Sequence, residues 1–172
     1  MTATPDRADL SMTYLMHHAL RRDLAAFARA VPRTPVAELD TWRALLRRWD
    51  VLTGVLRQTL RPMEAEHDEI DRLLSSCGAG LRKHVTGHAG ADDRAALAVR
   101  LCAARESLGR HLAHEDLEPL QLPVPLPWAL HQVPEDVRRD LLRAARPAQR
   151  TIWRMTHRRF ERLDRRAFRH LA

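Results

Sequence analysis

Apolar residues recur at helical spacing along most of the chain, and this periodicity constrains the fold more than any other feature. From Leu39 onward, nearly every third or fourth residue is apolar for about six turns. Such a stripe is typical of an amphipathic helix that buries one face. Its predicted inward positions are Leu39, Trp42, Leu45, Leu46, Trp49, Leu52, Leu56 and Leu60.

A second stripe predicts a helix before this one. It is expected from about Leu10 to Val31, and Pro32 should end it because proline cannot continue a helix. Thr34 and Pro35 are then expected to begin the next helix, as an N-cap followed by a proline in the first turn. The predicted inward face of the first helix is Leu10, Tyr14, His17, Leu20, Leu24 and Phe27.

Two further helices are expected before residue 116. Pro62 can open the third helix, which should fray near Gly78 and Gly80, and the segment from Lys83 to Asp92 is predicted to be a loop. The fourth helix is expected to begin near the end of that loop. The predicted inward positions are Met63, His67, Ile70 and Leu74 in the third helix, and Leu97, Leu101, Ala104, Leu108, His111 and Glu115 in the fourth.

The last third of the chain begins with the proline-rich run LEPLQLPVPLPW, which cannot continue a helix. We expect an ordered turn or an extended strap here, anchored by Trp128, and then helices over roughly Glu135–Ala145 and Pro147–His170. No strand-like alternation is present. The sequence therefore predicts an all-α fold, an up-down four-helix bundle with a C-terminal helical extension.

Length and composition indicate an ordinary globular protein. The chain has 172 residues, of which 45% are hydrophobic and 30% charged, enough for one domain with a core and unlike a disordered protein. No apolar run is long enough to span a membrane, and the N-terminus lacks a secretion signal. Two cysteines do not form a disulfide framework, so the cytoplasm is the expected location and no membrane partner is expected.

The formal net charge is +7, and Lys83 is the only lysine among 29 basic residues. An arginine excess suits phosphate or carboxylate recognition, but it is also typical of a GC-rich bacterial genome. The basic tail interleaves arginines with Trp153, Phe160 and Phe168, a pattern that could bind phosphates or pack an amphipathic helix on the bundle. No DNA-binding motif is present, so a nucleic-acid partner is not expected.

Three histidines fall on predicted inward faces of three different helices. They are His17, His67 and His111, and Glu115 follows one turn after His111. A buried imidazole or carboxylate is costly unless it is paired, hydrogen-bonded or bound to a metal. Helical bundles build metal sites from such inward side chains, so the four residues are candidates for one shared polar site.

Three segments resemble the hemerythrin-like (HHE cation-binding) domain family. MTYLMHHALRRDL resembles its first helix, MEAEHDEIDRLL its third, and HLAHEDLEPL its fourth with a His-x3-Glu pair, in that order from about Met12 to Pro119. The resemblance implies that His17, His67, His111 and Glu115 are metal ligands. His18 and His114 are exposed alternatives, and Asp116 could replace Glu115.

The second helix departs from the family. Its family counterpart continues into a His-rich stretch with a further His and Glu, whereas here RRWDVLTGVLRQTLRP runs directly into MEAEH. Four remaining ligands cannot readily hold two irons. The resemblance therefore implies at most a mononuclear site for iron or another divalent metal, acting in oxygen, nitric oxide or metal response, or no metal at all.

The alternative is a metal-independent small-molecule enzyme, for example a biosynthetic one. In that case His67, His111 and Glu115 would be acid–base groups around a pocket. No cofactor-binding motif or substrate is indicated, so a catalytic role stays open. A homodimer is also allowed, because a partner could cover apolar surface left by the shortened second helix.

The domain assignment follows from these segments. Residues 1–120 are expected to form the hemerythrin-like bundle. Residues 121–172 are expected to form the proline-rich strap and the basic C-terminal helices, which pack on the bundle.

Overall fold

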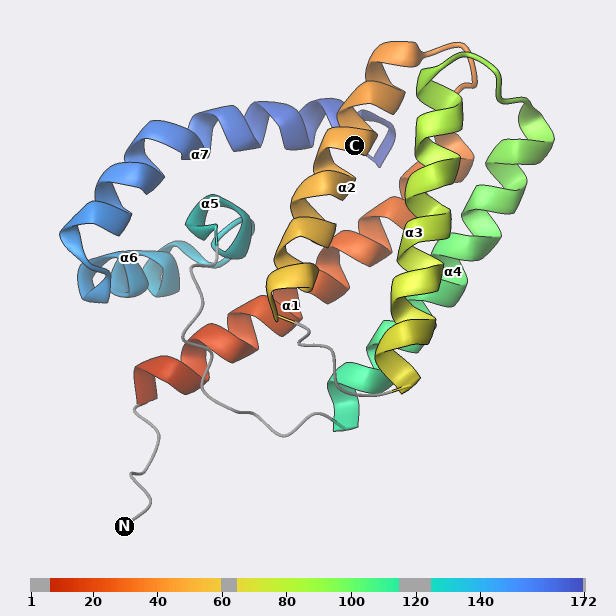
Figure 1. The fold of residues 1–172 in the computed structure, drawn as a ribbon. Helices are drawn as coiled ribbons and strands as arrows, with labels where there is room; N and C mark the ends of the chain where they lie inside the picture. The colour runs from red at the N-terminus through yellow and green to blue at the C-terminus, as the bar shows by residue number, and fades with distance from the viewer. Residues whose placement is uncertain (1–6, 60–64, 115–124, 172) are drawn as a thin grey trace.

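The computed structural model describes residues 7–59, 65–114 and 125–171, and side chains within 14–57, 68–112 and 125–171. All regular secondary structure in these ranges is helical, which confirms the all-α prediction (Figure 1). The α-helices are α1 (Arg7–Ala30), α2 (Leu39–Thr59), α3 (Ala65–Val85), α4 (Ala91–His114), α5 (Leu126–Ala129), α6 (Glu135–Ala144) and α7 (Pro147–Ala167). Short 3₁₀ turns are η1 (Val31–Arg33) and η2 (Arg169–Leu171). No described helix is long and apolar enough to cross a membrane.

The connection between α1 and α2 corrects one prediction. Thr34 does not cap α2, which begins only at Leu39. The Thr34 hydroxyl instead donates backward to the carbonyl oxygen of Ala30 at 2.9 Å, so it closes the end of α1. Trp42, in the first turn of α2, donates its indole N–H to the Pro35 carbonyl at 3.0 Å and fixes the connecting segment.

Helix α3 continues past both glycines that were expected to fray it, and the predicted Lys83–Asp92 loop shortens to residues 86–90. The glycines serve packing. A β-carbon on Gly80 would lie 2.9 Å from Leu97 Cδ1 of α4, and one on Gly78 would lie 3.1 Å from Trp49 Nε1 of α2. Gly87, with φ of +75°, adopts the left-handed conformation that follows many helix ends.

The predicted core positions are largely confirmed. The α2 stripe of Trp42, Leu45, Trp49, Leu52 and Leu56 is buried, as are Leu20, Leu24 and Phe27 of α1 and Leu97, Leu101, Ala104 and Leu108 of α4. The prediction for Tyr14 is wrong, since its side chain is 61% exposed and Met16 takes the buried position at that turn. Leu10, Leu60 and Met63, and the proposed start of α3 at Pro62, lie outside the described residues or side chains.

The helices contact one another in a closed series. Helix α1 packs on α4, α4 on α3, and α3 on α2, and a smaller contact joins α2 to α1. Helix α7 packs on the remaining side of α2, while α5 lies against α1 and α7 (Figure 1). Trp128 is fully buried, as expected for an anchor of the strap, but it lies in the short helix α5, which the sequence did not predict. Residues 117–124 of the strap are not described.

Candidate functional site

Two of the four predicted metal ligands can be placed. His17 lies on α1 with only 6% of its surface exposed, and His111 lies half-buried on α4. Each side chain makes a polar or ring contact within the protein. Because α1 and α4 pack on each other, both imidazoles belong to one helix pair.

Helices α1 and α4 run antiparallel to each other. Arg21 of α1 donates to the Leu112 carbonyl of α4 at 3.3 Å, whereas Arg94, near the start of α4, donates to the carbonyl of Thr34 just beyond α1 at 3.2 Å. His17 precedes Arg21 by one turn, and His111 is next to Leu112. The two histidines therefore lie toward the same end of the helix pair.

The other predicted ligands are not described. The side chain of His67, and residues Glu115 and Asp116, lie outside the described part of the chain, as does the His114 side chain. His18 is exposed, in agreement with its predicted position off the inward face. Among described side chains, no group of three or more His, Cys, Asp or Glu residues could hold a metal ion.

A second polar centre was not predicted, and it surrounds Arg48 of α2. This side chain is fully buried. Its Nη2 donates to Asp23 Oδ2 of α1 at 2.9 Å, and its Nε donates to Asp164 Oδ1 of α7 at 3.0 Å. The guanidinium carbon also lies 4.5 Å from the centre of the Phe160 ring, a cation–π distance. Arg48 thus connects three helices.

Asp23 receives further hydrogen bonds that fix its carboxylate. Trp128 Nε1 donates to Oδ2 at 2.8 Å, and Arg22 donates to Oδ1 from Nε at 2.9 Å and from Nη2 at 2.8 Å. Arg22 also donates to the backbone carbonyls of Trp128 and His131. These bonds attach the α5 region to α1.

His131 completes the centre on the other side. Its Nε2 lies 2.9 Å from Asp164 Oδ2, and Phe160 packs edge-on against its ring. Burial raises the pKa of Asp164, but the hydrogen bond from His131 and the charge of Arg48 outweigh it, so the pKa lies below its ordinary value. Asp164 is therefore an anion paired with Arg48 rather than a proton donor.

The sequence did carry a signal for this centre. Asp23 follows Leu20 by three residues and precedes Phe27 by four, so a charge occupies an inward position of α1. Arg48 likewise follows Leu45 by three residues and precedes Leu52 by four, so it occupies an inward position of α2. Two opposite charges inside apolar stripes predict a buried pair, although their partner Asp164 is 116 residues beyond Arg48.

Chemically, the two centres differ. The Arg48 centre, with Asp23, Asp164 and Arg22, balances two carboxylates against two guanidiniums and holds helices together. The His17–His111 region offers imidazoles, which are good ligands for iron, zinc and similar metals. Comparison with known proteins adds no identification, since no protein-family model, curated protein or solved structure matches the chain.

Proposed function

We propose that the chain is a hemerythrin-like four-helix bundle with a reduced, at most mononuclear metal site. The observation that carries this proposal is the buried imidazole of His17 near the level of His111 on the antiparallel helix α4. The closed series of contacts among α1, α2, α3 and α4 is what such a bundle requires.

The proposed metal would be held by the four residues that the family resemblance implies. His17 and His111 would supply two nitrogen ligands, and His67 and Glu115 would complete the set that the family resemblance implies. A bound divalent metal with an open position would activate water or dioxygen. The protein's own contribution is to exclude water through buried Met16, Leu108 and Leu112 and to fix the helix register through the Arg21–Leu112 hydrogen bond.

The test is metal content by mass spectrometry on protein purified without a histidine tag and then loaded with iron or zinc. We expect about one metal per chain in the unchanged protein, as a single mononuclear site would give. His17→Ala and His111→Ala should each lose the metal, whereas the adjacent His18→Ala should retain it. If circular dichroism shows that the protein is folded and it nevertheless binds no metal, the proposal is contradicted.

A further inference from the structure

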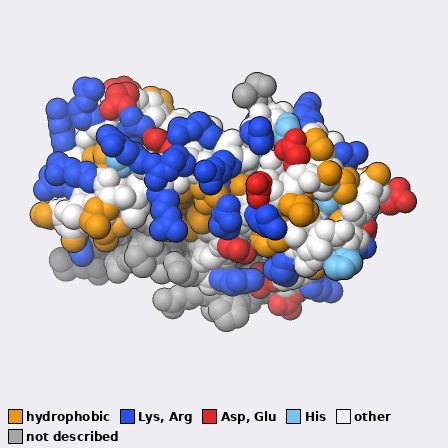
Figure 2. Space-filling model, turned by 90° about the horizontal axis from the view of Figure 1, so that it is seen from above, with side chains coloured by type: hydrophobic (Ala, Val, Ile, Leu, Met, Phe, Trp, Pro, Cys, Tyr) orange, Lys and Arg blue, Asp and Glu red, His pale blue; other side chains and the backbone are white. Residues whose placement is uncertain are grey.

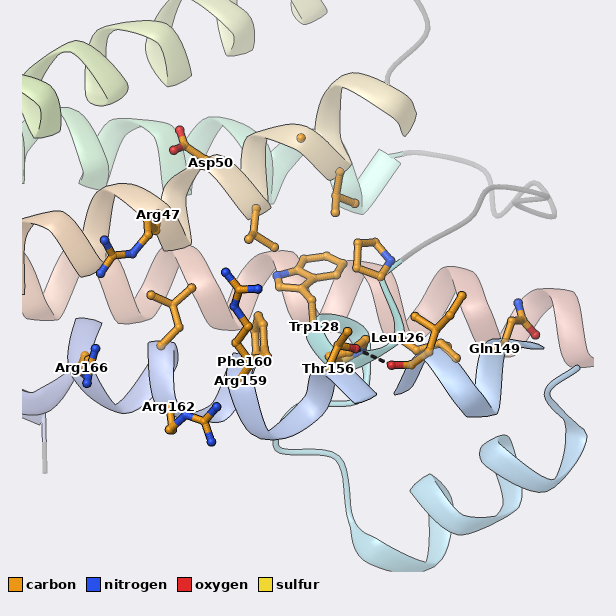
Figure 3. A pocket seen from close by; sticks show the side chains of 17 residues that line it. Arg47, Asp50, Leu126, Trp128, Gln149, Thr156, Arg159, Phe160, Arg162 and Arg166 are labelled. Atoms are coloured by element: carbon orange, nitrogen blue, oxygen red, sulfur yellow. Dashed lines mark hydrogen bonds between the residues drawn. The ribbon is translucent and has the colours of Figure 1, made fainter. Parts of the chain in front are cut away.

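A groove in the described part of the molecule lies away from His17 and His111. It has a volume of about 1090 Å³ and is bounded by α2, the region of α5, and α7. Its lining includes buried apolar side chains, which form its floor, and charged side chains, which form its rim (Figure 3).

The floor is apolar and firmly held. Trp128 is fully buried and Phe160 is 9% exposed, and both line the groove. Both also contact the Arg48 centre, because Trp128 donates to Asp23 and the Phe160 ring lies against Arg48 and His131. A floor fixed by buried ion pairs is organised before a ligand arrives, which reduces the entropy cost of binding.

The rim is cationic. Arg47 of α2 and Arg159, Arg162 and Arg166 of α7 line the groove, and all four are exposed. None forms an ion pair with a described residue, and Asp50 is the one acidic side chain in the described lining. Figure 2 shows Arg and Lys side chains gathered over the half of the molecule that carries α6 and α7, with apolar side chains between them.

The charges are concentrated toward one end. Arg47, Arg162 and Arg166 lie toward one end in Figure 3, and Asp50 lies at that end too. Arg159 lies beside Phe160 in the middle, near Trp128 and Thr156, and Gln149 lies at the other end. The lining of α7 extends from Gln149 to Arg166, a rise of roughly 25 Å at the usual 1.5 Å per residue. The groove is therefore elongated, and three of its four arginines lie toward one end.

We propose that this groove binds an amphiphilic organic anion. Its acid group is held among Arg47, Arg162 and Arg166. Its apolar body lies on the apolar lining, which includes the accessible side chains of Val51, Ile152 and Leu163 as well as Phe160. Arginine guanidiniums match carboxylate, sulfonate and phosphate groups through paired N–H donors. The apolar floor supplies the contact area that a small inorganic anion would leave unused.

The charge requirement is tested with paired probes. Anilinonaphthalene sulfonate, an aromatic anion whose fluorescence rises in apolar sites, is bound first and then displaced by decanoate or by 1-decanol. These competitors share a ten-carbon chain but differ in charge. Decanoate should displace the dye at a concentration about tenfold lower, since one charge-assisted hydrogen bond contributes about that factor.

Matched variants locate the site. Arg162→Gln/Arg166→Gln should weaken dye and decanoate binding about tenfold, while Arg154→Gln/Arg158→Gln, which changes net charge equally outside the groove, should alter it less than about twofold. Gly54→Leu tests the apolar part. A β-carbon at Gly54 meets nothing within 4 Å, so the larger side chain can extend into the groove without disturbing α2, and binding should fall while the circular dichroism is retained.

Three results overturn the proposal. They are an absence of dye binding, equal displacement by decanoate and 1-decanol, and equal effects of the two double variants. A dimer in size-exclusion chromatography that blocks dye binding and dissociates in Gly54→Leu would likewise overturn it, because the occupant would then be a second copy of the chain.

Discussion

The guanidinium of Arg48 lies without water exposure between carboxylates from α1 and α7. Two carboxylates that lose this partner remain buried near each other, and their mutual repulsion and desolvation are no longer offset. A buried charge without its partner is among the few defects that a small domain cannot easily absorb.

Replacing Arg48 by methionine, Arg48→Met, should therefore lower the free energy of unfolding by about 3–5 kcal/mol. Urea titration followed by circular dichroism measures this. Arg43→Met is the matched control on the same helix, because Arg43 pairs with Asp40 at 2.9 Å on the exposed surface and its loss should cost less than about 0.5 kcal/mol. Similar losses in the two variants would mean that the buried centre contributes no more than a surface pair.

His84 is the buried histidine whose charge state should affect stability. It is 1% exposed and stacks on Trp42 with ring centres 3.8 Å apart. Burial lowers its pKa from the ordinary value of 6.5, against the opposing effect of Asp93 and with a further lowering by Arg94 and Lys83. The folded protein therefore holds His84 neutral at a pH where the unfolded chain is already protonated.

The sign of the pH dependence follows from this difference. The contribution of neutral His84 to the free energy of unfolding is fully present above pH 6.5. It falls as the pH drops from 6.5 to the lower pKa that His84 has in the folded protein, because the unfolded state binds the proton first. In His84→Phe, which keeps a flat ring beside Trp42, the fall in the free energy of unfolding that His84 causes below pH 6.5 should disappear. Urea titrations at pH 7.5, 6.5 and 5.5 measure it, with the exposed His88→Asn as the control. Parallel declines in the unchanged protein and His84→Phe would contradict the assignment.

At the scale of helices, close approach depends on small residues. Helix α3 carries Gly80 against Leu97 of α4, so a methyl group there must displace a fully buried side chain. At Gly109 of α4, by contrast, an added β-carbon would meet nothing within 4 Å. Replacing glycine by alanine should therefore have opposite effects on the free energy of unfolding at the two sites.

Gly109→Ala should raise the free energy of unfolding by about 0.5–1 kcal/mol, because alanine is the better helix former. Gly80→Ala gains the same helix propensity but overpacks the α3–α4 contact, at a cost of about 1–3 kcal/mol. Thermal unfolding of both variants compares them directly. An equal gain in melting temperature would show that Leu97 moves aside without cost.

Helix positions were predictable because they depend on local signals. The periods of apolar residues, together with Pro32, Gly87 and Pro147, predict six of the seven described α-helices and their approximate ends. The short helix α5 was not predicted, because it lies in a proline-rich run. The error at Thr34 arose because a threonine before a helix can also bond backward to the preceding one. The prediction of fraying at Gly78 and Gly80 was wrong, since a glycine inside a helix signals either fraying or close packing, and only the neighbouring helix decides.

At the scale of the whole molecule, the candidate sites were less predictable. The inward placement of His17 follows from periodicity, and its burial confirms that placement. The metal assignment stays a prediction, since the His67 side chain and Glu115 lie outside the described residues. The groove could not be predicted, because it forms where Arg47 of α2 meets Arg166 of α7, and nothing local specifies that pairing.

Helix α6 is the described α-helix of more than one turn that packs least tightly on the rest of the molecule by burial of its side chains. It buries none of its residues, whereas α2 contributes much of the core. Local opening should cost little free energy there. Hydrogen exchange followed by mass spectrometry should find α6 amides exchanging well before those of α2 under the same conditions. Equal protection of both helices would show that α6 is secured by contacts outside the described residues.

The Arg48 centre also bears on how fast the chain can fold. Helical proteins usually fold quickly, because their contacts join residues near in sequence. Here Trp128 bonds to Asp23 across 105 positions, and Asp164 bonds to Arg48 across 116. The loop between Arg48 and Asp164 must close before the guanidinium has both carboxylates. The rate-limiting step should therefore be the docking of α7 onto preformed helices. Asp164→Asn should slow refolding more than a surface substitution that lowers the free energy of unfolding by the same amount.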